Sequence, residues 1–274
     1  MTLKRYPRTV INRLRLQVDD RSYEVAICFC WCAALDEYLS LSHDLHEKER
    51  ERFDKMDYER RRKSYLLGRH VGRSAASAVI GHDQRSDIFI DQGVFHQPIL
   101  VSPLLPNMQL SISHCDDLGA AIVFPEAVPM GIDIERICPG KKDAIESVIT
   151  EWEKELARNF PFDYETFLFC LWSAKESISK VFKTGLTASL AIYEVASLER
   201  GDNEFTLYYK NIFQYVTAVF IIHHYVCAVT YPKNVVLNSE SMLCFRRSLQ
   251  ELWQVNSQPD LTQSKGQILK MQDV

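Results

Sequence analysis

The residues with the clearest capacity for chemistry lie in two segments of the sequence. Residues 131–135 read Gly-Ile-Asp-Ile-Glu; a second segment, Trp-Ser-Ala-Lys-Glu-Ser, places Glu176 43 residues after Asp133, with Lys180 close behind. In a strand, alternate side chains share a face, so Asp133 and Glu135 point the same way with Cα atoms about 7 Å apart. Two hard oxygen donors at this spacing suit Mg²⁺, which completes its shell with water or phosphate. The segments therefore predict carboxylates and a lysine around a metal ion and a phosphate group.

The second segment belongs to a helix predicted over residues 164–182. Its apolar side chains recur every three or four residues and define a buried face: Phe167, Cys170, Leu171, Ala174, Ile178 and Val181. Glu176 and Lys180, at i and i+4, lie on another face, next to Lys175. Taken alone, the acidic strand also fits an exposed sheet edge and the helix an ordinary surface ion pair. It is their combination that favours a site.

Together the two segments resemble the signature of the 4′-phosphopantetheinyl transferase superfamily, a G-[IV]-D-x-E strand followed at similar spacing by a W-[ST]-x-K-E-[SA]-x-x-x-K helix. The resemblance implies an enzyme that moves the phosphopantetheine arm of coenzyme A to a serine of an apo acyl or peptidyl carrier protein, releasing 3′,5′-adenosine bisphosphate. It implies Mg²⁺ bound by Asp133, Glu135 and Glu176. Glu176, Lys180 and Asp133 are then the expected catalytic residues, with Glu176 the candidate base, directly or through a water.

Other blocks extend the resemblance toward a coenzyme A site. Residues 110–114, Leu-Ser-Ile-Ser-His, stand where the family has its N-[IV]-S-H strand end, with Ser111 in place of asparagine. Upstream, a charged helix and a Leu-Leu-Gly-Arg helix match the family's basic helices. Arg69 and Arg73, four residues apart, present two fork-shaped guanidiniums suited to phosphate oxygens, and only Arg73 is carried over. The expected coenzyme A contacts are Ser113, His114, Arg73, Lys175, Lys180 and, from the charged helix, Arg50 and Arg52.

The chain departs from the family pattern in two places. Residues 96–98 read His-Gln-Pro where relatives often have Gly-Lys-Pro, and residues 183–186 keep only part of a Gly-x-Gly-Leu turn. Neither change touches the expected metal carboxylates, so both bear on affinity and substrate preference. The altered first block supports one alternative, a non-catalytic relative that binds coenzyme A or a carrier protein. A second alternative is a metal-dependent hydrolase of nucleotide pyrophosphates, which would use the same acids with water as the nucleophile.

Composition excludes several classes of protein. The chain has 274 residues, 46% of them hydrophobic, so it can bury one large core or two modest ones and is not biased toward disorder. Its net charge of −4 is not basic enough for a nucleic-acid protein. The basic amino end lacks an apolar stretch typical of signal peptides, and the longest apolar run, residues 25–35, is too short to span a bilayer. We therefore expect a cytoplasmic protein with no membrane or nucleic-acid partner.

The eight cysteines show no framework of paired spacings. Cys28, Cys30 and Cys32 alternate along one predicted strand, which could suggest a thiolate metal site. Free cysteine packs as a small hydrophobe, however, and no C-x-x-C pair accompanies them. A buried strand with reduced thiols is the favoured reading.

The order of predicted elements indicates an α/β (α+β) fold. We expect strands near residues 24–33, 87–90, 109–113 and 120–124 with helices between 45 and 79 in a first half, residues 1–127. A second half, residues 128–232, would hold the Asp133 strand, helices near 142–158 and 164–182, and strands near 189–197, 204–209, 215–223 and 225–230. The resemblance implies that the halves are similar and related by a pseudo-twofold axis, with the active site in the cleft between them, and that the chain is a monomer of the larger, surfactin-type group. Residues 233–274 form an extension, with one possible helix over 239–255 and then a poorly ordered end.

Overall fold

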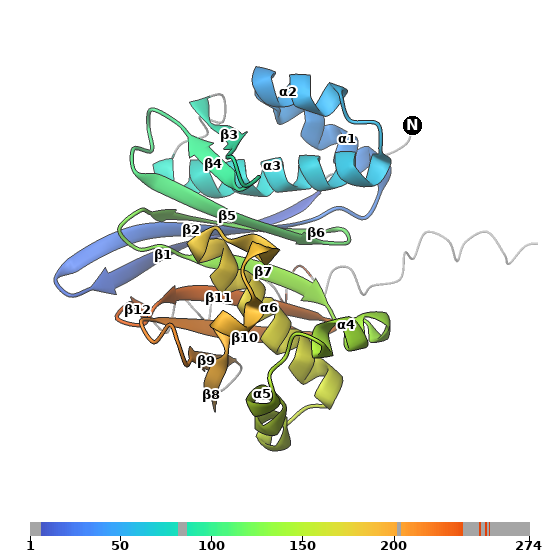
Figure 1. The fold of residues 1–274 in the computed structure, drawn as a ribbon. Helices are drawn as coiled ribbons and strands as arrows, with labels where there is room; N and C mark the ends of the chain where they lie inside the picture. The colour runs from blue at the N-terminus through green and yellow to red at the C-terminus, as the bar shows by residue number, and fades with distance from the viewer. Residues whose placement is uncertain are drawn as a thin grey trace, which may run out of the picture.

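The computed structural model describes residues 7–81, 87–201 and 204–237, together with residues 247, 250 and 252. Two five-stranded antiparallel sheets lie one above the other in Figure 1. The first has the order β12-β1-β2-β6-β5 and the second the order β7-β11-β10-β9-β8. The mixed α/β class expected from the sequence is confirmed, while the pseudo-twofold relation and the three segment boundaries stay predictions.

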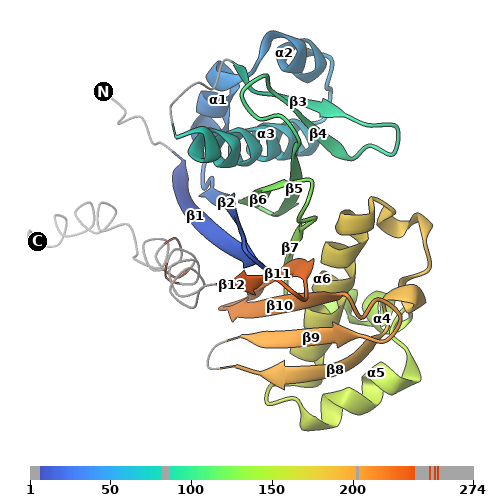
Figure 2. The ribbon, with the colours of Figure 1, turned by 90° about the vertical axis from the view of Figure 1, so that its left-hand side faces the viewer.

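The first half contains one long helix and several shorter elements around its sheet. The long helix α3 covers the sheet on the side away from the second sheet (Figures 1 and 2). A separate two-stranded hairpin, β3–β4, stands beside it. The bounds are β1 (Arg8–Val18), β2 (Arg21–Trp31), α1 (Leu35–Leu41), α2 (Glu47–Asp54), α3 (Glu59–Ile80), β3 (Phe89–Gln92), β4 (Pro98–Val101), β5 (Met108–Cys115) and β6 (Leu118–Pro125). Strand β12 (Val236–Leu237), from the carboxyl-terminal extension, joins the same sheet beside β1.

The second half is built around a second long helix, α6, which packs against β7, β10 and β11. The acidic strand β7 lies at one edge of its sheet, next to β11. The bounds are β7 (Gly131–Arg136), α4 (Lys142–Glu146), α5 (Glu151–Leu156), α6 (Tyr164–Phe182), β8 (Val195–Arg200), β9 (Phe205–Tyr209), β10 (Tyr215–Ile222) and β11 (Tyr225–Pro232).

One apolar core joins the two sheets. Side chains from β1, β2 and β6 pack with those from β7, β10 and β11, and Leu252 from the carboxyl-terminal extension is buried in the same cluster. Two further cores lie under α3 and α6. Because burial of apolar surface is the main favourable contribution to folding, the shared core fixes the two sheets against each other.

The junction between the halves runs along strands β5 and β7. Ser111 Oγ accepts the backbone N–H of Ile132 at 3.2 Å, and Ser113 Oγ accepts the N–H of Ile134 at the same distance. The free edge of β7 thus bonds to serine side chains, so two buried N–H groups are satisfied without a backbone ladder. This arrangement brings the Ser-Ile-Ser-His strand directly alongside the acidic strand.

Helix α6 has clear start and stop signals. Asp163 accepts the N–H of Thr166 at 2.9 Å as the N-cap, and the helix ends at Lys183, which has a positive φ of 57°. The helix lies very close to β7, since a Cβ on Gly131 would stand 2.1 Å from the Ser177 carbonyl oxygen. Only glycine at the start of the acidic strand allows this approach, which places α6 over Asp133.

Several local expectations were wrong. Strands β1 and β4 were not predicted from the sequence, whereas the helices expected between residues 45 and 79 are present as α2 and α3. The strand expected at 189–197 begins only at Val195, because Leu190–Tyr193 forms a 3₁₀ helix. The helix expected over 239–255 lies almost entirely outside the described residues. The alternating cysteines do lie in a buried region, and every cysteine of the described part of the chain is a free thiol.

Within the described ranges, no helix combines the length and apolar character needed to cross a membrane.

Candidate active site

Asp133 is the centre of a hydrogen-bond network between the two halves. Its side chain is 3% exposed, while Ile132 and Ile134 on either side of it point into the core. Oδ1 accepts from Ser113 Oγ at 2.9 Å and from Lys180 Nζ at 2.8 Å, and Oδ2 accepts from Ser173 Oγ at 2.8 Å. The buried carboxylate thus has three hydrogen-bond donors, one of which is the Lys180 ammonium. Asp133 and Lys180, from the two motif segments, are in direct contact.

Glu135 lies two residues along the same strand, nearer the surface. Lys141 Nζ lies 3.0 Å from Oε2, and Trp172 Nε1 is 3.4 Å from Oε1. Trp172 begins the Trp-Ser-Ala-Lys-Glu segment, so the two motif segments meet through this pair as well as through Asp133. The strand period and the helix period together bring Asp133, Glu135 and Trp172 to one side of β7.

Glu176 extends from α6 toward the same acids. Burial raises the pKa of Glu176 to about 7, with the negative charge of Asp133 as the second cause, while Lys180 acts in the opposite direction. Its Oε1 is buried and has no hydrogen-bond partner. An unpaired buried oxygen beside two other carboxylates is the kind of group that a bound cation would satisfy.

The donor chemistry of these acids therefore fits Mg²⁺, although the side chains are not arranged around a metal position. Among the residues that the structure describes, no three or more His, Cys, Asp or Glu side chains are grouped so that they could hold a metal ion. Lys180 bonds Asp133 and Lys141 bonds Glu135, so both carboxylates already have a cationic partner in this structure.

A pocket of about 710 Å³ opens beside Ser113 and Lys180, the two residues that bond Asp133 Oδ1, and among the described residues Lys180 is its one lining residue from the second half. Lys180 lines it from α6, and Ser113 and His114 line it from the end of β5. Partial burial in the pocket wall lowers the pKa of His114, and the positive charge of Lys180 lowers it further. The structure thus brings three of the residues expected at coenzyme A to one pocket.

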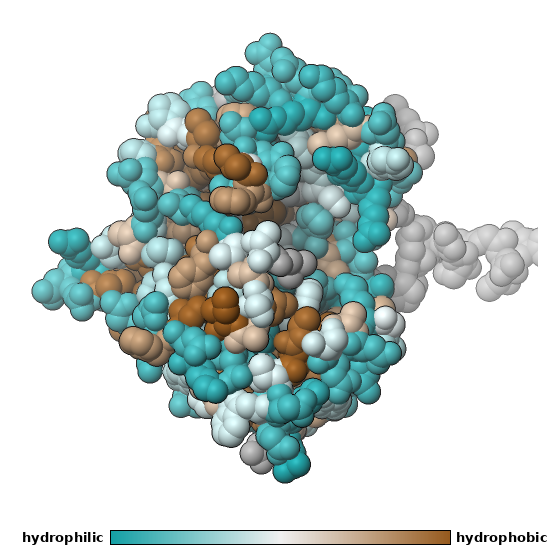
Figure 3. All heavy atoms as spheres, in the orientation of Figure 1, coloured by the Kyte–Doolittle hydropathy of each residue, from teal (hydrophilic) through white to brown (hydrophobic). Residues whose placement is uncertain are grey.

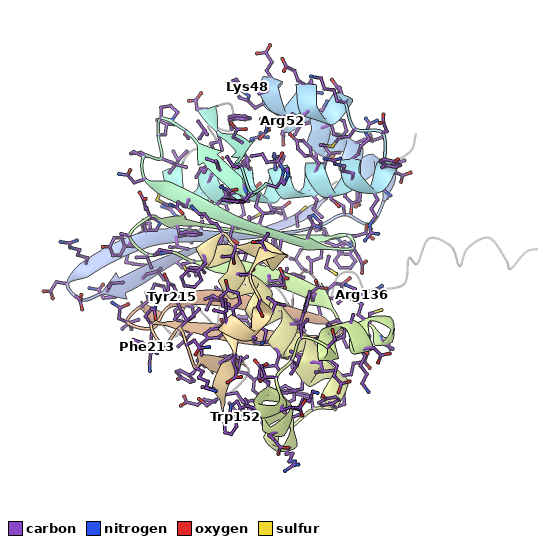
Figure 4. All side chains as sticks on the ribbon, viewed as in Figure 1. Lys48, Arg52, Arg136, Trp152, Phe213 and Tyr215 are labelled. Carbon is purple, nitrogen blue, oxygen red and sulfur yellow. The ribbon has the colours of Figure 1, made fainter. Side chains whose placement is uncertain are left out.

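Another wall of the pocket, also from the first half, is rich in cations. It includes Arg52 and Lys55 from α2 and the following turn, and Arg61 and Arg69 from α3. Arg52 pairs with Asp91 at 2.6 Å, yet its Nη1 is buried without a partner, as is Nε of Arg69. In Figure 4, Arg52 and Lys48 extend from α2 at the top of the molecule, and both lie near the ring of Phe89. Guanidinium donors with unused N–H groups suit phosphate oxygens.

The remaining wall of the pocket is formed by the β3–β4 hairpin, including His96 and Pro98. Gln97, which stands in place of the usual lysine, points its amide back to its own turn, where Oε1 accepts the Phe95 N–H at 3.0 Å. In Figure 3 the outer surface around α2 is strongly hydrophilic, whereas brown apolar residues gather lower on the same face of the upper half. The pocket lining itself combines these charged side chains with apolar ones, Met56, Pro98 and Ile112.

Two of the side chains expected to contact coenzyme A, Arg73 and Lys175, do not line the pocket. Arg73 is 1% exposed and its guanidinium binds Glu49 and two backbone carbonyls, of Asp44 and Ile88. Lys175 is fully buried on the far side of α6, 2.8 Å from Glu153. Both side chains turn into the half that carries them, because each has a buried carboxylate partner.

The basic helix α2 is only partly as expected. Arg50 donates to the Ser42 carbonyl at 2.5 Å and does not line the pocket, so Arg52 is its pocket-facing arginine. Arg69 was not carried over as a phosphate contact, although it lies one turn before Arg73 and lines the pocket. Helical spacing placed both arginines on similar faces, and only the position of Glu49 distinguishes them.

Comparison with known proteins agrees with this arrangement. A family model of the 4′-phosphopantetheinyl transferase superfamily matches residues 129–230, which contain β7 and α6. A 4′-phosphopantetheinyl transferase of Bacillus subtilis is 31% identical over 164 residues, which cover 59% of this chain and 69% of that protein. The chain belongs to this superfamily. It is a phosphopantetheinyl transferase, and the residues matched by the family model include Asp133, Glu135, Glu176 and Lys180.

Proposed function

We propose that this transferase moves the phosphopantetheine arm of coenzyme A to a serine of an apo acyl or peptidyl carrier protein and releases 3′,5′-adenosine bisphosphate. The observation that carries this proposal is the position of Lys180, which bonds Asp133 at 2.8 Å and also lines the cation-rich pocket. The carboxylates and the pocket for a polyphosphate ligand therefore share a wall. This is the geometry that a transfer at the coenzyme A pyrophosphate requires.

Binding of the adenosine bisphosphate part is assigned to the pocket. Arg52 and Arg69 have unused buried N–H groups there, and Arg61 and Lys55 add positive charge. Ser113 and His114 stand on the side of the pocket nearest the carboxylates, so we assign them to the pyrophosphate. Their position at the end of β5 holds the reacting phosphorus near Lys180.

The chemical step needs charge stabilisation and a proton acceptor. Lys180 Nζ is the group that places positive charge against the pyrophosphate oxygens as the bond to adenosine bisphosphate breaks. Glu176, whose Oε1 has no partner, is the candidate to accept the serine proton, directly or through a water. Asp133, Glu135 and Glu176 are the residues that would hold Mg²⁺, which when bound would neutralise charge developing on the pyrophosphate.

The partner implied by the family is a carrier protein that supplies the attacking serine. We expect the enzyme to act as a monomer in the cytoplasm, with coenzyme A as co-substrate. Membership of the family supports the two substrates, and the resemblance to the larger, surfactin-type group supports the monomer.

The direct test is the intact mass of a purified apo carrier domain after incubation with the enzyme, coenzyme A and Mg²⁺. A gain of one phosphopantetheine that needs Mg²⁺ and is lost with Asp133→Ala would support the proposal. Glu24→Ala is the control, because this acid pairs with Arg15 on the exposed surface of strands β1 and β2. Release of adenosine bisphosphate without a carrier would instead indicate a hydrolase. Coenzyme A binding with no mass gain across acyl and peptidyl carriers would favour a non-catalytic relative.

A further inference from the structure

Each half contains a buried glutamate in the same structural setting. Glu49 is the third residue of α2 and accepts the N–H of the N-cap residue His46 at 3.1 Å. Glu153 is the third residue of α5 and accepts the N–H of its N-cap residue Thr150 at 2.9 Å. Both side chains are completely buried, so each is a capping-box carboxylate that has been taken into the core.

Each glutamate also binds the beginning of a strand and a buried cation. In the first half, Glu49 accepts the N–H of Ile90 at 2.9 Å and pairs with Arg73 of α3. In the second half, Glu153 accepts the N–H of Val195 at 2.8 Å and pairs with Lys175 of α6 at 2.8 Å. In both cases one carboxylate joins a short helix, a strand and the long helix. A buried charge must be paired and hydrogen-bonded in this way to be tolerated.

In the first half the pair controls the availability of Arg69. Nε of Arg69 lies 3.6 Å from Glu49 Oε1, too far for a hydrogen bond, and is buried with no partner. Glu49 is already bonded to Arg73 and to two backbone N–H groups, so its contact with Arg69 stays a long ion pair rather than a hydrogen bond. Arg69 instead rests over the Tyr65 ring at 4.4 Å and lines the pocket. Removal of Arg73 would free Glu49 to bind Arg69.

In the second half the pair controls the segment that follows α6. Lys175 Nζ also donates to the Leu190 carbonyl at 3.1 Å, and Glu153 holds Val195, so the segment between them is fixed at both points. Residues 188–191 of this segment line a hollow of about 570 Å³ together with Trp172, the residue that touches Glu135. The pair therefore holds a segment that shares this hollow with Trp172, and neither Lys175 nor Glu153 lines the cation-rich pocket.

We infer that Arg73 and Lys175 are positioning residues with separate effects: Arg73 keeps Arg69 available to a phosphate group of the ligand, and Lys175 keeps the carboxylate side of the site in its working shape. The inference rests on the proposed function only where kcat is measured. Ligand binding tests the Arg73 part independently of transfer.

The experiment measures the Kd of 3′,5′-adenosine bisphosphate by calorimetry and kcat with coenzyme A and a carrier domain, on the full-length enzyme. Arg73→Met is expected to raise this Kd about tenfold, because Arg69 would lose one charge-assisted hydrogen bond to the ligand. The effect on kcat is expected to be smaller. Lys175→Met is expected to lower kcat about tenfold and to change the Kd by less than about twofold. Lys175→Arg, which can keep the ion pair, is expected to recover most of kcat.

Companion variants separate positioning from loss of folding. Arg73→Met combined with Glu49→Gln removes the unpaired buried charge, so this double variant should fold. Because a neutral amide does not attract the Arg69 guanidinium, the double variant should also recover the wild-type Kd within about twofold. Lys175→Met combined with Glu153→Gln should regain thermal stability but not kcat.

Several outcomes overturn the inference. The first is a Kd that rises about tenfold or more in Lys175→Met, because this would indicate a direct phosphate contact. The second is a kcat that recovers together with stability in the Lys175–Glu153 double variant. The third is a Kd that stays high in the Arg73–Glu49 double variant. If the wild-type enzyme itself transfers nothing in the same assay, the proposed function fails, while the Kd comparison still decides the role of Arg73.

Discussion

Ser113 Oγ donates a 2.9 Å hydrogen bond to Asp133 Oδ1 and accepts the backbone N–H of Ile134 at 3.2 Å. The two residues belong to strands of different halves, β5 and β7. One hydroxyl therefore both closes the edge of the acidic strand and fixes a carboxylate of the site. Asp133 owes its position to the contact between the halves as much as to its own strand.

Ser113→Ala is expected to lower the free energy of unfolding by about 1–3 kcal/mol, because it leaves the buried N–H of Ile134 unpaired. It should also lower kcat, since Asp133 loses a donor. Ser111→Ala is the matched control: Ser111 binds the N–H of Ile132 in the same way but does not contact the carboxylate. Denaturant unfolding and turnover of both variants check this prediction. An equal loss of kcat in the two variants would contradict it.

Gly131→Ala is expected to move α6 away from β7, because the new Cβ would lie 2.1 Å from the Ser177 carbonyl oxygen. Overpacking of this kind costs about 1–3 kcal/mol of stability, and here it also separates Glu176 from Asp133. We therefore expect a lower melting temperature together with a large loss of transfer activity. Gly140→Ala serves as the control, because a Cβ there meets nothing within 4 Å. A Gly131→Ala variant as active and stable as Gly140→Ala would show that the close approach is not required.

Arg69→Met is expected to weaken binding of 3′,5′-adenosine bisphosphate roughly tenfold to a hundredfold, the usual loss for hydrogen bonds to a charged group. Arg62→Met, on the same helix, should change the Kd by less than about twofold, because the Arg62 guanidinium lies over the Phe53 ring outside the pocket. Calorimetric titration of both variants at two salt concentrations provides the measurement. Equal weakening by both would indicate a general charge effect, and the assignment of Arg69 would be wrong.

His114 should make coenzyme A binding depend on pH. Partial burial, and then the charge of Lys180, lower the pKa of this imidazole in the free enzyme. A bound phosphate favours the protonated ring, so binding takes up a proton and the imidazole contribution to affinity grows as the pH falls. The Kd ratio of His114→Asn to wild type is expected to increase between about pH 8 and about pH 6, where histidine titrates. The ligand phosphates titrate in the same way with both proteins, so their contribution cancels in the ratio. A ratio that stays constant would exclude His114 as a phosphate contact.

The sequence by itself determined the acidic strand and the lysine helix. Asp133 and Glu135 follow from the strand period, and the capped helix over 164–182 follows from its apolar spacing, because both patterns are local and repeat within a few residues. The mixed α/β class also followed from the order of such patterns. Motif spacing was sufficient to indicate the chemistry, since the residues that carry it lie in two short segments.

Only the tertiary structure decided where the basic side chains point. Arg69 and Arg73 are one turn apart on one helix, yet Arg69 lines the pocket and Arg73 is buried against Glu49. Glu176 and Lys175 are neighbours in sequence, yet Glu176 lies beside Asp133 while Lys175 pairs with Glu153. The partner acids lie more than twenty residues away along the chain in both cases. Since a buried charge goes where a distant opposite charge is placed, no local pattern could have distinguished these side chains.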